Sequence, residues 1–349
     1  MNLEPRTSNA SSLVIGTRGS KLALWQAEHV VGRLREAFPD WTMRLETIKT
    51  TGDKILDVPL AQVGGKALFV KEIEEALLAG RVDLAVHSMK DVPTEVPAGL
   101  VIAAVSERED PLDVLISRTG TKLVDLPEGA CVGTSSLRRQ AQLLHYRPDL
   151  TVVGLRGNLD TRIRKLQDEG LDAIVVAAAG VKRLGLAHLV TEFLPPEILL
   201  PAIGQGALGI EIRGPRIEGR GAGERESWGG GTSRAPSRVP GAASRHQGTA
   251  EIVAVLDHPE THRAVLAERA MLARLEGGCQ VPIAAHATVA GEGITLRGLV
   301  ASLDGKRVVR GEMRGATGSP EAVGTSLAED LLLRGAAEIL HEIYAQGEP

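Results

Sequence analysis

Basic and hydroxyl side chains gather in short stretches that each follow an apolar run of the chain. Apolar runs of this length predict strands, and in open α/β sheets ligands bind at the carboxyl ends of strands. The candidate ligand-binding side chains at these ends, or in the first helical turn after them, are Arg18, Ser20, Lys90, Asp91, Thr134, Ser136, Arg138, Arg139, Arg156, Asn158 and Arg162. Arginine pairs with carboxylates and phosphates through two hydrogen bonds, and helix N-termini favour anions. Gathered in one cleft of a chain of net charge −4, the arginines indicate a small polyanionic ligand. The alternative is that each is a solvated surface residue.

Asp91 follows the apolar run Val82–Val86 and stands beside Lys90 in the sequence HSMKD. A partly desolvated carboxylate at this place could act as an acid or base, or stabilise a developing cation. A helix N-cap or an ion pair with Lys90 is an equally weighted structural alternative.

Cys279 lies in the sequence EGGCQVP, which predicts a loop. Its thiolate could be a nucleophile or an attachment point, and the alternative is a small buried cysteine. Cys131 lies in an apolar run and fits that alternative. Two cysteines exclude a disulfide framework and a Cys-rich metal site. His258 and His262 have the spacing of helix-face ligands but no partner segment, so we expect no metal.

Strands and helices alternate through the first two hundred residues, which predicts α/β lobes with helices on both faces of each sheet. A strand, the pair Gly-Thr and a helix follow one another at Gly16-Thr17 and again at Gly133-Thr134. Two similar lobes that face a cleft are the expected arrangement.

The last third of the chain has a different pattern. Residues 214–249 are rich in Gly, Pro and Arg and lack periodic apolar residues, which predicts a disordered insert. A helical period over Ile252–Leu275, three strand-like runs and an amphipathic stretch at Ala322–Tyr344 then predict a small α+β domain.

Composition narrows the class of protein. The 349 residues are 43% hydrophobic and carry no basic excess, which argues against a general nucleic-acid binder. The N-terminal sequence lacks the apolar region of a secretory signal, and no apolar run is long enough to span a bilayer. We therefore expect a cytoplasmic protein with no membrane partner.

Several of these stretches together match one family: the chain resembles the porphobilinogen deaminases, also called hydroxymethylbilane synthases. The matching stretches are IGTRGSKLALWQA, TTGDKILDVPLAQVGGKALFVKEIE, VDLAVHSMKDVP, EREDPLDVLISR, VGTSSLRRQAQL, LRGNLDTRIRKL, AAAGVKRLG, LPAIGQGALGIEIR and AERAMLARLEGGCQVPI. They run in order from residue 13 to about 283 and are interrupted by residues 214–249.

The resemblance implies a transferase of porphyrin, tetrapyrrole and heme biosynthesis. Such an enzyme joins four porphobilinogen molecules head to tail into the linear tetrapyrrole hydroxymethylbilane and releases ammonia at each step. It carries a dipyrromethane cofactor, held here by a thioether to Cys279. The implied fold has two doubly wound lobes like periplasmic binding proteins, formed by residues 13–106 with 203–213 and by 111–200. A C-terminal α+β domain of residues 250–349 carries the cofactor.

The resemblance also assigns residue roles. Asp91 is the catalytic carboxylate, which assists loss of the amino group and stabilises cationic intermediates. The cofactor-binding residues besides Cys279 are Ser20, Lys90, Thr134, Ser136, Arg138, Arg139 and Asn158. The substrate-binding residues are Arg18, Arg156, Arg162 and Arg183.

Asp160, in GNLDTR, is an acid where the family more commonly has another residue. The rival hypothesis is a non-catalytic two-lobe binding protein for a small anion, against which the GGCQVP loop counts. We expect a monomer.

Overall fold

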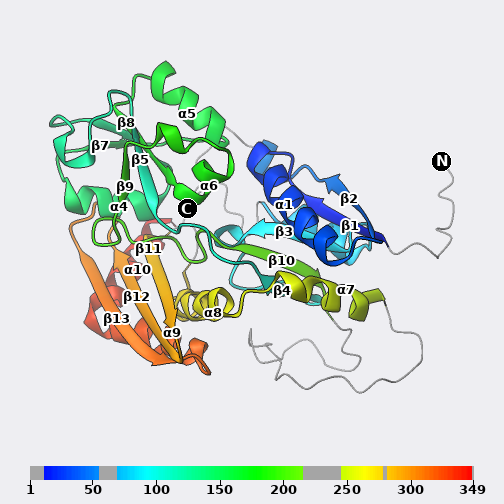
Figure 1. The fold of residues 1–349 in the computed structure, drawn as a ribbon. Coiled ribbons are helices and arrows are strands. Elements are labelled where there is room, and N and C mark those ends of the chain that lie inside the picture. Colours follow the sequence, from blue (N-terminus) through cyan, green and yellow to red (C-terminus); the bar gives the residue numbers. More distant parts are fainter. Residues whose placement is uncertain (1–11, 55–68, 215–244, 278–280, 348–349) are drawn as a thin grey trace.

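The computed structural model describes residues 12–54, 69–214, 245–277 and 281–347. Within these residues the strands form three sheets, two of five strands and one of three. We call the parts built on them lobe 1, lobe 2 and the C-terminal unit (Figure 1). The predicted fold class, two α/β lobes and a small α+β unit, is confirmed.

Lobe 1 has the strand order β2-β1-β3-β10-β4. Its strands are β1 (Ser12–Thr17), β2 (Thr42–Thr47), β3 (Leu84–Ser88), β4 (Leu100–Val105) and β10 (Leu208–Arg213), and its helices are α1 (Lys21–Ala37), α2 (Thr51–Lys54), α3 (Lys71–Leu78) and the 3-10 turn η1 (Met89–Asp91). Strands β1, β2 and β3 run parallel, whereas β10 is antiparallel to both β3 and β4. Strand β10 belongs to the lobe 1 sheet although it follows lobe 2 in the chain.

The lobe 1 sheet is buried on both faces because its side chains alternate in direction. Leu13 and Ile15 pack toward α1, while Val14 packs toward α3 with Ile73 and Leu77. A sheet covered on both faces has its ligand-accessible surface at the strand ends.

Lobe 2 has the order β7-β6-β8-β5-β9. Its strands are β5 (Asp113–Ser117), β6 (Cys131–Gly133), β7 (Thr151–Val153), β8 (Ala173–Ala177) and β9 (Glu192–Leu194), and its helical segments are η2 (Leu123–Asp125), α4 (Leu137–Tyr146), α5 (Leu159–Asp168), α6 (Ala178–Arg183) and η3 (Ala187–Leu189). Val132 and Val175 pack with Leu143 of α4 on one face. Ile174 and Leu166 of α5 pack on the other.

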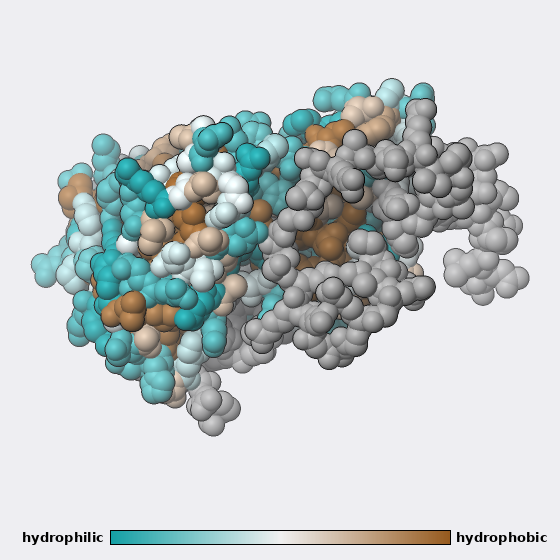
Figure 2. All heavy atoms as spheres, turned by 90° about the horizontal axis from the view of Figure 1, so that it is seen from below, coloured by the Kyte–Doolittle hydropathy of each residue, from teal (hydrophilic) through white to brown (hydrophobic). Residues whose placement is uncertain are grey.

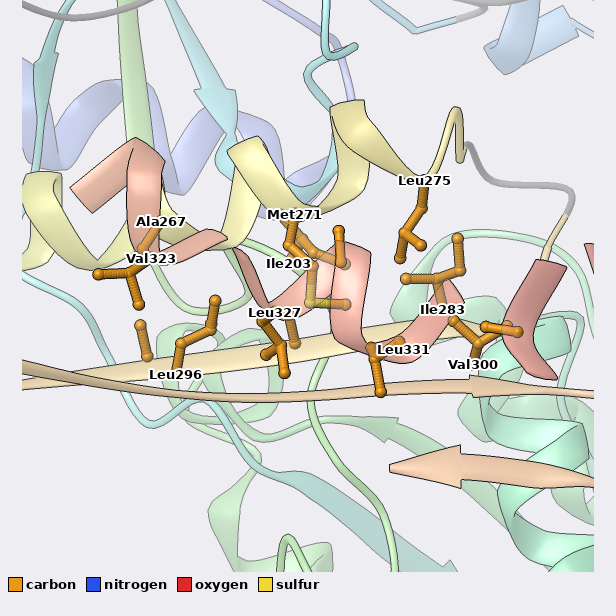
Figure 3. Packing of buried hydrophobic residues seen from close by; sticks show 14 of the residues in the cluster. Ile203, Ala267, Met271, Leu275, Ile283, Leu296, Val300, Val323, Leu327 and Leu331 are labelled. Carbon is orange, nitrogen blue, oxygen red and sulfur yellow. The ribbon is translucent and has the colours of Figure 1, made fainter. Parts of the chain in front are cut away.

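The C-terminal unit consists of the antiparallel sheet β11 (Ile283–Ala290), β12 (Gly293–Ala301) and β13 (Val308–Ala316) with helices α8 (Pro259–Arg274), α9 (Pro320–Leu331) and α10 (Ala337–Gly347). Met271 of α8 and Leu327 of α9 pack on Leu296 of the sheet (Figure 3). The expected single closing helix breaks at Gly335, whose φ of 105° is not helical.

Residues 245–256 correct two expectations. Helix α7 (Arg245–Val253) makes residues 245–249 helical, although they were expected to belong to a disordered insert; residues 215–244 lie outside the described chain. Ile252, Val253 and Leu256, the last in η4 (Ala254–Leu256), pack in the lobe 1 core. The expected start of the C-terminal domain at residue 250 is therefore wrong, because these apolar side chains are buried against lobe 1.

The two chain segments that connect the lobes run side by side. Glu109 N donates to Gly206 O (3.1 Å), and Gln205 Nε2 donates to Pro111 O (2.6 Å). Gly206 has a φ of 92°, and a Cβ there would lie 2.1 Å from Glu109 O, so the close approach requires glycine.

The C-terminal unit also contacts lobe 2. The tip of its β12–β13 hairpin rests on α4, where His145 Nδ1 donates to Gly305 O (2.9 Å). A Cβ at Gly305 would lie 2.4 Å from Ala141 O.

On the face seen in Figure 2, hydrophilic residues separate the apolar patches wherever grey atoms do not cover the surface.

Candidate active site between the lobes

Asp91 lies at the carboxyl end of β3, at the last position of η1. The first residue of the turn, Met89, anchors it: its side chain is 1% exposed and its N–H donates to Ala207 O (3.0 Å). Lys90 is half-buried and Asp91 is exposed. The turn thus presents a solvent-accessible carboxylate beside a partly desolvated ammonium group.

Charges from the two lobes act on one another at this place. Burial lowers the pKa of Lys90 to about 8, while Asp91 raises it and Arg139 of lobe 2 lowers it. Burial likewise lowers the pKa of Arg162 to about 10; Arg139 lowers it further, Asp91 of lobe 1 raises it, and Arg156 lowers it. We call Lys90, Asp91, Arg139, Arg156 and Arg162 the interlobe cluster.

Arg138 and Arg139 bind a carboxylate that the sequence-based assignment missed. Asp113, fully buried, accepts from Arg138 Nη1 (2.7 Å) and from Arg139 Nη2 (2.7 Å) and Nε (3.1 Å). Arg138 and Arg139 hold the pKa of Asp113 far below its ordinary value, against the effect of burial. Arg138 also donates to Leu200 O (2.7 Å), and Arg139 to Val175 O (3.0 Å). The two arginines therefore stabilise lobe 2, and their expected contact with a cofactor stays a prediction.

Arg156 and Arg162 fit an anionic ligand better. The Nη1 atom of Arg156 is buried without a hydrogen-bond partner among the described residues. Arg162 donates from Nε to Gly157 O (2.7 Å), which orients the side chain. A buried, unpartnered guanidinium nitrogen costs free energy that a carboxylate ligand would recover. The residues present therefore fit the acetate and propionate groups of a dipyrromethane.

The hydroxyl residues serve as local caps. Ser20 Oγ accepts from Ala23 N (3.2 Å) at the start of α1, and Ser136 Oγ accepts from Arg139 N (3.4 Å) at the start of α4. Thr134 is buried and accepts from Ser136 N (3.2 Å). Asn158 is the N-cap residue of α5 but makes no side-chain cap bond and is exposed, so its amide faces solvent.

Asp160 has a partner in the other lobe. Its carboxylate lies 3.3 Å from Lys21 Nζ, which joins the first turn of α5 to the first turn of α1. Both side chains are exposed, so the pair contributes at most about 1 kcal/mol. The pair nevertheless shows that the Ser20 and Asn158 ends of the two helices face each other.

Arg18 and Arg183 each lie over an aromatic ring of lobe 1. The Arg18 guanidinium stacks over the Phe69 ring, 4.3 Å from its centroid. Arg183 Nη2 donates to Gly206 O (2.6 Å), and its guanidinium lies 5.9 Å from the Trp25 ring centroid. Burial lowers the pKa of Arg183 to about 10, and Glu109 opposes this. Their predicted role in substrate binding stays a prediction.

Helix α8 carries two buried charged residues that the sequence-based assignment also missed. Glu268 accepts from Gly204 N (2.7 Å) and Ala287 N (2.8 Å), and it pairs with Arg108 (2.9 Å). Arg269 donates to main-chain carbonyls just after Asp91. Both lie in AERAMLARLEGGCQVPI, where a charged pair inside an apolar helix was the available signal. Cys279, in the same motif, lies outside the described residues.

Two further findings concern ligands and membranes. In the part of the chain that the structure describes, no group of three or more His, Cys, Asp or Glu side chains is placed to hold a metal ion. No helix among the described residues has the length and apolar character needed to cross a membrane.

Comparison with known proteins gives a consistent result. The family model described as porphobilinogen deaminase, dipyromethane cofactor binding domain, matches residues 13–218, and that of the porphobilinogen deaminase C-terminal domain matches residues 262–333. The porphobilinogen deaminases of Geobacter metallireducens and Moorella thermoacetica are 55% and 53% identical to the chain. Each match covers 95% of this chain, and 95% and 96% of those proteins respectively.

A solved periplasmic solute binding protein from Desulfovibrio salexigens is 12% identical, with a TM-score of 0.36, over 59% of this chain and 67% of that one. This likeness is too slight to bear on function. The family models and the identity over nearly the whole length show that the chain belongs to the porphobilinogen deaminase family.

Proposed function

We propose that Asp91 is the catalytic carboxylate of this transferase, which carries a dipyrromethane cofactor and joins four porphobilinogen molecules into hydroxymethylbilane. The observation that carries the proposal is the exposed Asp91 carboxylate opposite cations of lobe 2, with Asp91 and Arg162 close enough for Asp91 to raise the Arg162 pKa. In the described chain, the other carboxylate beside these cations, Asp113, is buried and already bound to two arginines.

The chemistry assigned to Asp91 follows from its charge and its exposure. Loss of ammonia leaves a cation on the substrate, and a fixed carboxylate stabilises that cation most strongly in the transition state. In its protonated form the Asp91 carboxyl group can donate a proton to the amino group that leaves as ammonia. The carboxylate that results can accept the proton that the pyrrole carbon loses when the new C–C bond forms. The dipyrromethane group, when bound, supplies the pyrrole carbon to which the first substrate is joined.

The cations of the cluster hold the substrate and cofactor in place. Each pyrrole unit brings two carboxylates, so a bound chain of several units is strongly anionic. Arg156 and Arg162 receive these carboxylates from lobe 2, and Lys90 receives them from lobe 1 beside Asp91. We assign the remaining contacts to Ser20, Thr134, Ser136, Arg138, Arg139, Asn158, Arg18 and Arg183, as the family resemblance implies.

Cys279 is the proposed anchor of the cofactor. Helix α8 ends at Arg274, five residues before it, and α8 touches the segment that follows Asp91. The segment after Asp91 is thus held by the helix that precedes the proposed attachment point in the sequence. We further propose a monomer that acts in the cytoplasm; sedimentation equilibrium should give a single species of about 36.9 kDa plus cofactor.

Replacement of Asp91 tests the proposal. Asp91→Asn should bind the cofactor, retain substrate affinity and lose roughly 10²-fold in kcat, because charge and proton capacity disappear while size is kept. Asp91→Glu should retain part of the activity. Intact mass must first confirm the two-pyrrole adduct in each variant, with Cys279→Ser as the variant that lacks it.

Wild-type kcat in loaded Asp91→Asn would refute the catalytic role. Intact mass also separates the rival function, since a non-catalytic anion-binding protein would carry no adduct.

A further inference from the structure

Arg269 donates to three successive main-chain carbonyls directly after Asp91. Its Nη1 bonds to Val92 O (2.9 Å), and its Nη2 bonds to Pro93 O and to Thr94 O (3.1 Å). The side chain is only 5% exposed although it carries a charge. A buried guanidinium that donates to three carbonyls of one short stretch of backbone fixes that stretch.

The segment that Arg269 holds forms no regular secondary structure. Residues 92–97 belong to no strand or helix, and Pro93 and Pro97 have no N–H to donate to a sheet. Val92 is buried with Met89 and with Val265, which lies on α8 one turn before Arg269. Helix α8 therefore holds the segment through both apolar contact and hydrogen bonds.

Helix α8 is itself fixed where Arg269 leaves it. The preceding residue, Glu268, is completely buried and accepts main-chain hydrogen bonds from Gly204 and Ala287. Ala287 lies on β11 and Gly204 on the segment that returns from lobe 2. Because α8 is fixed at this point, the Arg269 side chain holds the segment after Asp91 in a fixed position relative to α8.

We propose that Arg269 is a positioning residue for Asp91: it holds the backbone after Asp91 on α8, and so fixes the position of the carboxylate relative to α8. This proposal rests on the proposed catalytic role of Asp91. Burial lowers the pKa of Arg269 to about 10, so the guanidinium is charged at neutral pH and all three bonds are charge-assisted.

Loaded Arg269→Met enzyme tests the proposal, with Arg263→Met as the matched control, because Arg263 is exposed on the same helix. A displacement of about 1 Å costs up to about 10²-fold in rate, so kcat should fall roughly 10- to 100-fold with KM changed less than about threefold. Hydrogen–deuterium exchange of a peptide spanning residues 88–96 should speed up at least about tenfold. The control should match the wild type in both measurements. Wild-type kcat or wild-type exchange in Arg269→Met would overturn the proposal.

A second pair of variants distinguishes positioning from general destabilisation. Adding Arg269→Met to Asp91→Asn should lower kcat less than about twofold further, because the carboxylate being positioned is already absent. If Arg269→Met lowers kcat in the Asp91→Asn background by as much as in the wild type, the role of Arg269 is refuted but that of Asp91 is not. Wild-type kcat in Asp91→Asn would refute the role of Asp91 and, with it, this proposal.

Arg269→Lys serves if the methionine variant does not fold. Lysine keeps the charge but lacks the planar fork that reaches several carbonyls. We expect a folded, loaded enzyme with kcat and exchange between those of the wild type and those expected for Arg269→Met. Wild-type values of both in Arg269→Lys would show that the fork is not needed and overturn the proposal.

Discussion

The two lobes each bury a carboxylate, with opposite consequences. In lobe 2, Asp113 binds Arg138 and Arg139, which hold its pKa far below the ordinary value. In lobe 1, burial raises the pKa of Glu74 to about 7; Glu211 raises it further and His87 lowers it. His87 Nε2 donates to Glu211 Oε2 (3.0 Å), so the nearest imidazole already has a partner.

Both carboxylates are buried, so the difference in how stability depends on pH comes from their neighbours: two arginines beside Asp113 and another carboxylate near Glu74. Asp113 stabilises lobe 2 above the ordinary pKa of an aspartate, and that stability is lost as the pH falls through its lowered pKa. Glu74 stabilises lobe 1 while protonated, and that stability is lost as the pH rises from about 4.5 through about 7. At neutral pH the buried charge of Asp113 therefore stabilises lobe 2, whereas the buried charge that Glu74 acquires destabilises lobe 1.

Breaking the lobe 2 pair should have the largest effect on stability. Asp113→Asn leaves two buried guanidinium groups without their counter-charge, so the free energy of unfolding should fall by about 3–5 kcal/mol at pH 7. Denaturant unfolding of Asp113→Asn and of Asp91→Asn, which removes an exposed carboxylate, gives the comparison. Equal stability of the two variants would contradict a structural role of Asp113.

Replacing the lobe 1 carboxylate should stabilise the protein, in a pH-dependent way. Glu74→Gln resembles the protonated form, so its advantage should be small near pH 4.5 and reach at most about 3 kcal/mol at pH 8. Glu28→Gln, at an exposed position of α1 in the same lobe, should show no such trend in thermal unfolding. A constant difference across this range would mean that Glu74 does not titrate in the folded protein.

The cations of the interlobe cluster should also differ between the lobes in their response to pH. Lys90 loses its charge as the pH rises through about 8, whereas Arg162, with a pKa of about 10, keeps its charge. If Lys90 binds a substrate carboxylate, kcat/KM should fall by up to about tenfold per pH unit above pH 8. Lys90→Arg should remove this fall, and Lys21→Arg, an exposed control, should keep it. A fall that persists in Lys90→Arg belongs to another group.

Much of the fold and part of the site could be predicted from sequence because local patterns determine them. The apolar run Val82–Val86 places Asp91 at a strand end, and Ser20 and Ser136 begin helices after Gly-bearing turns. His258, considered as a metal ligand, caps α8 by accepting from Thr261 N (3.2 Å), as a residue at a helix start can.

The missed residues depend on contacts between segments far apart in the chain. Asp113 and Arg138 are 25 positions apart, and Arg269 lies 177 positions from Val92. On α8, Glu268 and Arg269 are a charged pair flanked by apolar residues. Their burial depends on contacts with the segment after Asp91, the segment that returns from lobe 2 and β11. The boundary error at residue 250 has the same origin, since Ile252 would fit either of two cores.

The late position of β10 in the chain sets an order of events at the ribosome. Lobe 2 has all its strands once Leu194 has emerged, so its sheet can close on a contiguous nascent chain. Lobe 1 begins earlier, but β4 is paired through β10, which is translated only after lobe 2. Until then, the edges of β3 and β4 are exposed to pairing with other chains. The N-terminal lobe, although made first, is therefore completed second, and its unfinished sheet is the part of a nascent polypeptide that a chaperone would need to protect.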